Sequence, residues 1–584
     1  MKAEVYPPQA APKATRAGRM KLWEWLAMAA ILGVGAWLRF SNLDLLEFKG
    51  DEAIALHLAY RLVHGTEVPL AGLMSSVGVT NPPLFIYLLI PMVAISSNPA
   101  FVSCCIAVLG LTAVAVCWHI GRKYYGAVTG LVGAAMFAVS PWAVIYSRKI
   151  WSLDFVPVIN ACALWAVHAL VIDKKPKAVF GVLLLPLCVI QIHFSGLALT
   201  ATVLVILLVS RPKIDWGFAA AGVALATLIA LPYLKFQTEN DWADFRKAVA
   251  IVSGQEHHIS SGMRLDPNTG GPLPQRDCYR QAIAIVDAGR MEDLLGLSTR
   301  RELDPQGIWP LIHGKQAQYF DETARWSLRG LWFQQGLLMG ALILLALFTW
   351  RGLKGWTRFP FIAVADDPRS QGAWLLLCWM VGPLLVFAAT RLWTSASYFV
   401  ILYPSPFLAL GLLADCGWRA TGRWGRSWKA VVIAALAIVV MADLVFWKEF
   451  TRFLRSNGGA HGSYGTVLSY KQSAAHYLAS HVDVPNLMQT GRLMQMDQVG
   501  KFMRGRMDVV LLALLAGDNE QTSRPTNVTV IVVDENRTNF GGDAYNRWLS
   551  SHGDEIEAGR MNFGPLQLHF LHRPMELQWK SHWD

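Results

Sequence analysis

The stretch from Leu22 to Glu52, LWEWLAMAAILGVGAWLRFSNLDLLEFKGDE, decides the fold. Its first part, Leu22–Leu38, is apolar and reaches the ~17 residues that a membrane-crossing helix needs. The acidic pair Asp51-Glu52 follows, on the far side of this span from the basic N-terminal segment 1–21. Charge is costly near a bilayer and tends to line cavities, bind ions or carry out chemistry. We therefore expect a membrane protein with a reactive acidic site at the membrane surface.

The composition indicates a polytopic membrane protein. The 584 residues are 54% hydrophobic and 16% charged, whereas soluble domains carry about 25% charged residues. The net charge of +11 does not require a nucleic-acid partner, and we expect none, because membrane proteins collect Lys and Arg in their cytoplasmic loops. Residues 1–21 read as a disordered cytoplasmic tail. The span after them has no small-residue cleavage site, so we interpret it as a retained anchor.

Basic clusters near Arg122, Lys174, Arg211, Arg351 and Arg419 fix the expected topology. The positive-inside rule places all of them in the cytoplasm, so an even number of crossings must separate neighbouring clusters. The short apolar run 83–96 must then be an interfacial or re-entrant helix. The expected α-helical fold has about eleven spans, with the N-terminus inside and the C-terminus outside: 22–38, 98–120, 127–147, 155–172, 178–192, 196–210, 215–234, 331–350, 372–390, 398–415 and 429–447.

We expect a transmembrane domain at residues 22–447. Three segments of the chain would lie in the outer compartment. The outer loop 39–97 should contain an amphipathic interfacial helix, residues 51–64, with Ile54, Leu58 and Leu62 as its apolar positions. The segment 235–328 is a long polar loop. The segment 448–584 has the size of a small domain, with a helical pattern at 472–481 and a strand pattern at 528–533. We expect it to be an extracytoplasmic α/β domain.

Short motifs in a fixed order carry a resemblance to a known family. The chain resembles integral-membrane glycosyltransferases of the C superfamily, in particular the protein O-mannosyltransferases and the lipid A aminoarabinose transferase. The similarity covers approximately residues 20–420, and Asn81 stands where family members often have His or Lys. The motifs are Arg39-Phe-x-Asn42-Leu, Phe48-Lys-Gly-Asp51-Glu52-Ala, Asn81-Pro82-Pro83-Leu84, Ser147-Arg148-x-x-x-x-x-Asp154 and Tyr398-Phe-x-x-x-Tyr403-Pro404.

The resemblance implies inverting transfer of a sugar from a polyprenyl-phosphate donor to a hydroxyl of a glycan, lipid or protein. Asp51 would be the base that takes the hydroxyl proton, Glu52 would support it, and Asp154 would complete the acidic cluster. A divalent metal, if one is used, would bind these same carboxylates. Arg39 would orient the first outer loop, and cationic donors would hold the leaving phosphate. The further candidate substrate-binding residues are Asn81, Arg148, Lys149, His193, Arg391 and Tyr398.

Other readings of these residues stay open. Asp51 and Glu52 are also typical of a helix N-terminus, Asp154 can pair with Arg148 structurally, and basic residues near span ends often anchor to headgroups. A transporter or flippase of lipid-linked saccharides is the alternative function, but it predicts ionisable residues and repeats within the spans. The bacterial character of the resemblance indicates a plasma membrane and the cell envelope. The sequence does not identify the sugar, the acceptor, the polyprenyl length or the oligomeric state.

Overall fold

The computed structural model describes residues 20–252 with one short gap, and it describes parts of the chain after them. The described residues are 20–75, 78–252, 322–353, 368–390, 396–424, 426–460, 464–490, 492–496, 502–503, 508–516, 528–534 and 557–571. Most of the predicted tail 1–21 and most of the predicted loop 235–328 therefore lie outside the described residues.

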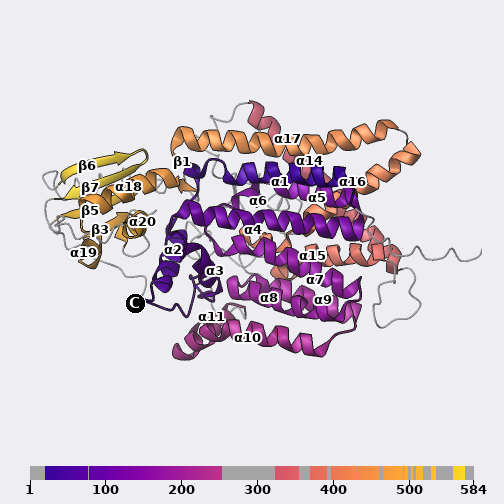
Figure 1. The fold of residues 1–584 in the computed structure, drawn as a ribbon, viewed down its shortest axis with the longest axis horizontal. Helices are drawn as coiled ribbons and strands as arrows, with labels where there is room; N and C mark the ends of the chain where they lie inside the picture. The colour runs from indigo at the N-terminus through magenta and orange to yellow at the C-terminus, as the bar shows by residue number, and fades with distance from the viewer. Residues whose placement is uncertain are drawn as a thin grey trace, which may run out of the picture.

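Long helices lie side by side and form the body of the molecule (Figure 1). Most spans predicted from the sequence fall on one of them, but two are interrupted. Within the predicted span 127–147 the long helix ends at Val139, and the predicted span 398–415 is broken at Tyr403-Pro404, before the helix that begins at Ser405. Five helices have the length and apolarity to cross a membrane, namely the segments 99–125, 152–171, 216–239, 370–387 and 428–457, and shorter apolar helices accompany them. The helices are α1 (Leu22–Phe40), α4 (Pro99–Ile120), α5 (Ala127–Val139), α7 (Val156–Val171), α8 (Val179–Ile192), α9 (Gly196–Ser210), α10 (Trp216–Glu239), α14 (Glu322–Leu353), α15 (Pro368–Thr390), α16 (Ser405–Trp424) and α17 (Arg426–Asn457).

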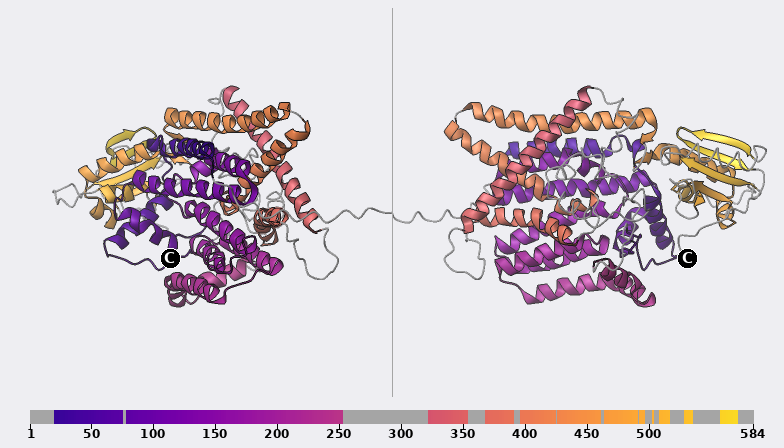
Figure 2. Two further views of the ribbon diagram at one scale, coloured as in Figure 1. Left: turned by 45° about the vertical axis from the view of Figure 1, so that its right-hand side comes forward. Right: turned by 180° about the vertical axis from the view of Figure 1, so that it is seen from behind.

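Short helical segments connect and extend these long helices. Seen from behind, α14 crosses the bundle obliquely and packs against α15, α16 and α17 (Figure 2). The last long helix of the bundle, α17, runs to Asn457, which is ten residues beyond the predicted end of its span at 447. The connecting segments are η1 (Leu43–Leu45), η2 (Gly121–Tyr125), α6 (Pro141–Ile145), η3 (Ser152–Phe155), η4 (Pro176–Ala178), α11 (Ala243–Val252) and η7 (Ala396–Leu402).

Two helices lie across one end of the bundle. The expected interfacial helix is α2 (Gly50–Val63), and the short apolar run forms α3 (Leu84–Val93), against which α2 packs (Figure 1). The face of α2 that is buried consists of Ala53, Ala55, Leu56 and Ala59, not of the predicted apolar positions. The larger residues at those positions, such as Ile54, are only half-buried. Small side chains let α2 lie close to the protein and leave bulkier ones for the surroundings.

The chain after α17 forms a mixed sheet with helices. Its strand order is β4-β3-β5-β7-β6, with β3 parallel to β5 and the other neighbours antiparallel. The predicted helix and strand here correspond to α18 and β5. We call this part the C-terminal unit, and it lies beside α2 (Figure 1). Its elements are β1 (Gly459–Ala460), β2 (Gly465–Thr466), α18 (Leu468–His481), α19 (Val484–Gln489), β3 (Leu493–Met496), β4 (Phe502–Met503), α20 (Asp508–Ala516), β5 (Thr529–Asp534), β6 (Glu557–Phe563) and β7 (Leu566–Leu571).

Ion pairs gather the basic clusters at the opposite end of the bundle. Arg122 Nε lies 2.6 Å from Glu24 Oε2, which joins the end of α4 to the start of α1. Lys123 Nζ lies 2.5 Å from Asp173 Oδ2, beyond the end of α7. These contacts bring together the chain segments that the even-crossing argument placed on one side.

Close helix contacts require glycine at several positions. A Cβ on Gly411 of α16 would lie 2.3 Å from the carbonyl oxygen of Thr129 on α5 and 3.1 Å from the backbone nitrogen of Gly133. Small residues commonly allow such close backbone approach between membrane helices. At Gly336 of α14, in contrast, an added Cβ would meet no atom within 4 Å.

We expect Gly411→Ala to destabilise the bundle by about 1–3 kcal/mol, because the backbone of α5 cannot move aside locally. Gly336→Ala is the matched control and should leave stability unchanged or raise it by about 0.5–1 kcal/mol through better helix propensity. Thermal unfolding in detergent, followed by fluorescence-detected size exclusion, measures both. Equal midpoints for the two variants would contradict the tight α5–α16 contact.

Candidate active site

The first loop, Ser41–Lys49, leads from α1 to the acidic pair. Asn42 adopts a left-handed conformation with φ 52°, a conformation that asparagine tolerates better than most residues. Leu45, Leu46 and Phe48 are buried and fix the loop against the protein. At its end the backbone N–H of Lys49 donates to Glu52 Oε2 at 3.0 Å, which caps the first turn of α2. The sequence thus places Asp51 and Glu52 in a defined helical turn.

The two carboxylates of the acidic pair differ in their exposure. Glu52 is 2% exposed, whereas Asp51, one residue earlier, is exposed. Successive residues on a helix point about 100° apart, so a terminal turn lying on the protein naturally separates such neighbours. Glu52 is therefore held within the protein, and Asp51 is the carboxylate that a substrate can reach.

Lys149 joins the two segments that carry the predicted acidic motifs. Its Nζ lies 3.5 Å from Glu47 Oε1 and 3.9 Å from Glu52 Oε1. It also lies 4.1 Å from the ring centroid of Trp151, in a cation–π contact. Lys49 pairs with the same Glu47 carboxylate. Two lysines and two glutamates thus share one small, largely buried volume.

This packing changes the pKa values of the cluster. Burial acts to raise the pKa of Glu47, but Lys149 and Lys49 outweigh it and lower that pKa. Burial raises the pKa of Glu52, and the same lysines oppose the rise without cancelling it. Burial acts to lower the pKa of Lys149, but Glu47, Glu52 and Asp154 raise it. The ammonium of Lys149 is therefore firmly protonated at neutral pH.

Asp154 lies at the edge of the same cluster, in η3. Its Oδ2 accepts a hydrogen bond from the backbone N–H of Trp151 at 3.1 Å. Its Oδ1 is buried and has no hydrogen-bond partner among the described residues. The charges of Lys149 and Glu52 both act on this carboxyl group. Asp154 thus lies close enough to Glu52 and Lys149 for their charges to act on it.

Two of the three candidate arginines, Arg39 and Arg148, bind backbone carbonyls. Arg39 is 1% exposed and donates to the carbonyls of Gly35 and Ala138 at 3.1 and 2.7 Å. Arg148 donates to the carbonyls of Leu38 and Asn42 at 2.7 and 2.8 Å. Both therefore fix the end of α1 and the start of the first loop, and the burial of Arg39 suits an orienting role.

The remaining candidates are His193, Tyr398, Asn81 and Arg391. His193 and Tyr398 contact each other with ring centroids 4.8 Å apart, and burial lowers the pKa of His193 to about 4. Asn81 donates its side-chain amide to the carbonyl of Leu73 at 3.0 Å, while its Oδ1 is buried without a partner in the described chain. Arg391 lies outside the described residues.

Sequence reasoning missed Glu47. A signal was present, because Glu47 interrupts the apolar residues Leu45, Leu46 and Phe48, and a charge between buried neighbours indicates a buried partner. That partner, Lys149, lies 102 residues away, so no local pattern could reveal it.

The donor set suits an ammonium better than a metal ion. Lys149 already occupies the space between Glu47 and Glu52, and Asp51 points away from Glu52. No group of three metal-ligating side chains comes together in the part of the chain that the structure describes. A divalent cation bound to these carboxylates would have to displace the side chain of Lys149.

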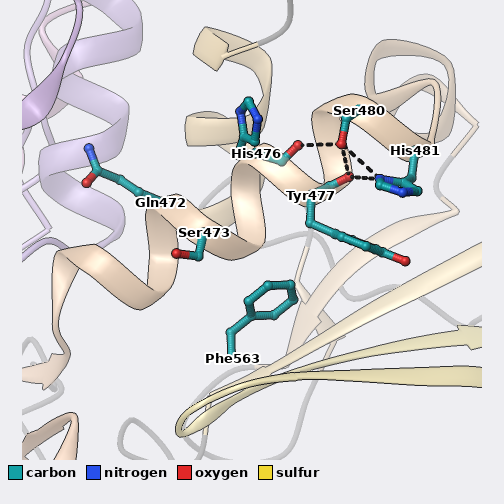
Figure 3. A pocket seen from close by; sticks show the side chains of 7 residues that line it. All are labelled: Gln472, Ser473, His476, Tyr477, Ser480, His481 and Phe563. Atoms are coloured by element: carbon teal, nitrogen blue, oxygen red, sulfur yellow. Dashed lines mark hydrogen bonds between the residues drawn. The ribbon is translucent and has the colours of Figure 1, made fainter.

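A separate shallow hollow lies on the C-terminal unit. It borders the face of α18 that points toward Phe563 of β6, and Ser480 Oγ and His481 Nδ1 lie 2.8 Å apart at its rim (Figure 3). No residue of the carboxylate cluster lines it. The lining residues are Gln472, Ser473, His476, Tyr477, Ser480, His481 and Phe563.

These features define a multi-pass membrane protein with a charged site at one end of its helical bundle. Comparison with solved structures gives the particular fold, that of ArnT from Cupriavidus metallidurans. The match to ArnT bound to undecaprenyl phosphate has a TM-score of 0.50 at 12% identity, and it covers 94% of this chain and 98% of that one. The apo form matches with a TM-score of 0.49 at 13% identity, over 94% and 97% of the two chains. No family model and no curated protein sequence matches this chain.

The resemblance that the motifs indicated is therefore confirmed at the level of the fold. It extends beyond residues 20–420, because the match covers nearly the whole of both chains.

Lys149→Met should destabilise the protein by about 3–5 kcal/mol at neutral pH, because it leaves Glu47 and Glu52 buried without this cation. The lowered pKa of Glu47 means that its stabilisation is present above about pH 4.3 and is lost as the pH falls through its folded-state value. The raised pKa of Lys149 means that its stabilisation is present below about pH 10.4 and is lost as the pH rises beyond that. The deficit of the variant should therefore shrink on acidification below about pH 4.

Thermal unfolding of the wild type and the variant across this pH range measures the effect. The control is Lys235→Met, which removes an exposed pair with Glu239 and should cost at most about 1 kcal/mol. A Lys149→Met deficit that does not change with pH would refute the ion-pair explanation.

Proposed function

We propose that this protein is an inverting glycosyltransferase that moves a sugar from a polyprenyl-phosphate donor to an acceptor hydroxyl. The observation that carries the proposal is the divided acidic pair, with Asp51 exposed and Glu52 buried against Lys149, at the end of a bundle with the ArnT fold. The ArnT structure is described as bound to undecaprenyl phosphate, which supports a lipid of that class as the carrier here.

In the proposed reaction Asp51 is the general base. The acceptor hydroxyl oxygen forms a bond to the anomeric carbon, its proton passes to the Asp51 carboxylate, and the bond between that carbon and the phosphate oxygen breaks. The phosphate leaves with the electron pair. Glu52 and Asp154 place negative charge near the positively charged sugar in the transition state, as carboxylates do in glycoside hydrolysis.

The leaving phosphate needs cationic donors. Lys149 and Arg148 are neighbours in the chain at the acidic end of the bundle, and Arg391 is the third candidate from the sequence. Arg148 uses two of its five N–H donors on carbonyls, so three remain for a ligand. Asn81, His193 and Tyr398 would line the path of the donor lipid or sugar.

The proposed topology places the acidic end on the outer face of a plasma membrane. The basic clusters at the other end would be cytoplasmic by the positive-inside rule. Eleven crossings then put the C-terminal unit, whose predicted boundary is residue 448, in the outer compartment. An acceptor as large as a glycan, lipid or protein can approach from there.

One observation favours the alternative, a transporter or flippase of lipid-linked saccharides. Asp443 in α17 is fully buried, and neither of its carboxylate oxygens has a hydrogen-bond partner among the described residues. Ionisable residues inside membrane helices often mark transport pathways. The two functions differ in whether the bond between sugar and phosphate is broken.

Asp51→Asn should lower the transfer rate by about 10²–10⁴-fold, because it removes the base but keeps the shape of the side chain. The assay gives purified protein a panel of radiolabelled undecaprenyl-phosphate sugars, with membrane extract as the acceptor source. Asp44→Asn is the matched control, since Asp44 lies in the same loop with a side chain 52% exposed, and its activity should stay within about twofold of wild type.

Transfer by the wild type and by Asp44→Asn, but not by Asp51→Asn, would support both the reaction and the base. Normal transfer by Asp51→Asn would keep the enzyme but move the base to Glu52 or Asp154. Movement of intact lipid-linked sugar across liposomes without cleavage would favour the transporter.

A further inference from the structure

We propose that the C-terminal unit positions Asp51, and that Lys471 and Tyr464 are positioning residues for the reaction. This inference rests on the proposed function only for the role of Asp51. The structural part, that these residues fix the first turn of α2, stands on its own geometry.

Three carbonyls of the first loop accept hydrogen bonds from one short segment of the C-terminal unit. Tyr464 Oη donates to Leu45 O at 2.5 Å, and the backbone N–H of Leu468 donates to Leu46 O at 2.9 Å. Lys471 Nζ donates to Phe48 O at 2.6 Å. We call Tyr464, Leu468 and Lys471 the loop anchor. The carbonyls it binds are different from Leu38 O and Asn42 O, which Arg148 binds.

Lys471 is itself fixed from two directions. Its side chain is fully buried, and its Nζ lies 2.8 Å from Asp508 Oδ2 and 3.8 Å from Asp534 Oδ2. Asp508 begins α20, and Asp534 ends β5. A buried ammonium between carboxylates from a helix and a strand has little freedom, so the direction of its third contact is set by the C-terminal unit.

That third contact acts on the peptide group that precedes Asp51 by two residues. The carbonyl of Phe48 and the N–H of Lys49 belong to one planar peptide unit. Lys471 binds its oxygen, while Glu52 Oε2 accepts from its N–H at 3.0 Å. A cation at one end and a carboxylate at the other polarise the peptide in the same sense and strengthen both hydrogen bonds. The orientation of the Phe48–Lys49 peptide plane is thereby fixed from both sides.

The fixed orientation of this peptide plane determines where Asp51 lies. Residues 50–52 form the first turn of α2, and the capping bond of Glu52 sets the direction in which that turn begins. Loss of the loop anchor would free the peptide unit to rotate and let Asp51 move. Misplacement of a reacting group by about 1 Å can lower a rate by about 10²-fold.

The test uses the full chain in detergent micelles with three variants. Tyr464→Phe removes one hydrogen bond to the loop and leaves no buried charge unpaired. Lys471→Met removes the contact with Phe48 O. Thr490→Val is the matched control, because Thr490 Oγ1 donates at 2.8 Å to Asn486 O, a bond within the C-terminal unit that involves neither Lys471 nor its two carboxylates.

Hydrogen exchange of the peptide that covers Lys49 to Ala53 gives a readout that needs no donor or acceptor. We expect exchange about tenfold faster in Lys471→Met and clearly faster in Tyr464→Phe, with Thr490→Val close to wild type. In the transfer assay, kcat should fall about 10–100-fold for Lys471→Met, with KM for the lipid-linked sugar within about threefold.

Unchanged exchange in both Tyr464→Phe and Lys471→Met would overturn the proposal. An equal effect of Thr490→Val would also overturn it, because general loosening of the C-terminal unit would then be the cause. If the wild type transfers no sugar, the proposed function fails, and the exchange experiment still decides whether the loop anchor fixes α2.

Discussion

The ammonium group of Lys149 is the interaction on which the acidic site depends. It lies between Glu47 of the first loop and Glu52 of α2, and it comes from the segment between α6 and η3. A buried carboxylate without a cation is costly, and two of them side by side are costlier still. Lys149 therefore allows the first loop and α2 to lie against the bundle at all. The exposed position of Asp51 is a consequence, because burial of Glu52 directs its neighbour outward.

Much of the fold could be predicted because the bilayer constrains it. Backbone polar groups must be satisfied internally in lipid, so apolar runs of sufficient length become helices, and most of the predicted spans fall on single helices. The two that are interrupted, 127–147 and 398–415, each contain an internal proline next to the break, at Pro141 and Pro404. The run 83–96 was too short to cross and forms the short helix α3. The length of the apolar run did not predict where α17 ends. A helix can continue past its apolar part where other protein packs against it, and the C-terminal unit follows directly after α17.

The site was predictable only where it is local in sequence. The motif around Asp51-Glu52 and the segment from Ser147 to Asp154 identified two of its parts, and the structure brings these together through Lys149. Glu47 and Lys471 were missed because their partners lie 102 and 423 residues away along the chain. Hydrophobic spacing marked the large apolar residues of α2, but it did not reveal that the face packed on the protein is made mainly of alanines, which allow close approach.

The long separation between the first loop and its anchor has a consequence for biosynthesis. Leu45 and Tyr464 are 419 residues apart, so at ~5–20 residues per second the ribosome needs roughly 20–80 s to make the second after the first. During that interval the carbonyls of Leu45, Leu46 and Phe48 have only water or transient partners. The nascent chain can insert its helices in order, but its acidic site is completed last, when the segment after α17 emerges. A prematurely terminated chain would thus carry a membrane bundle with an unfinished site.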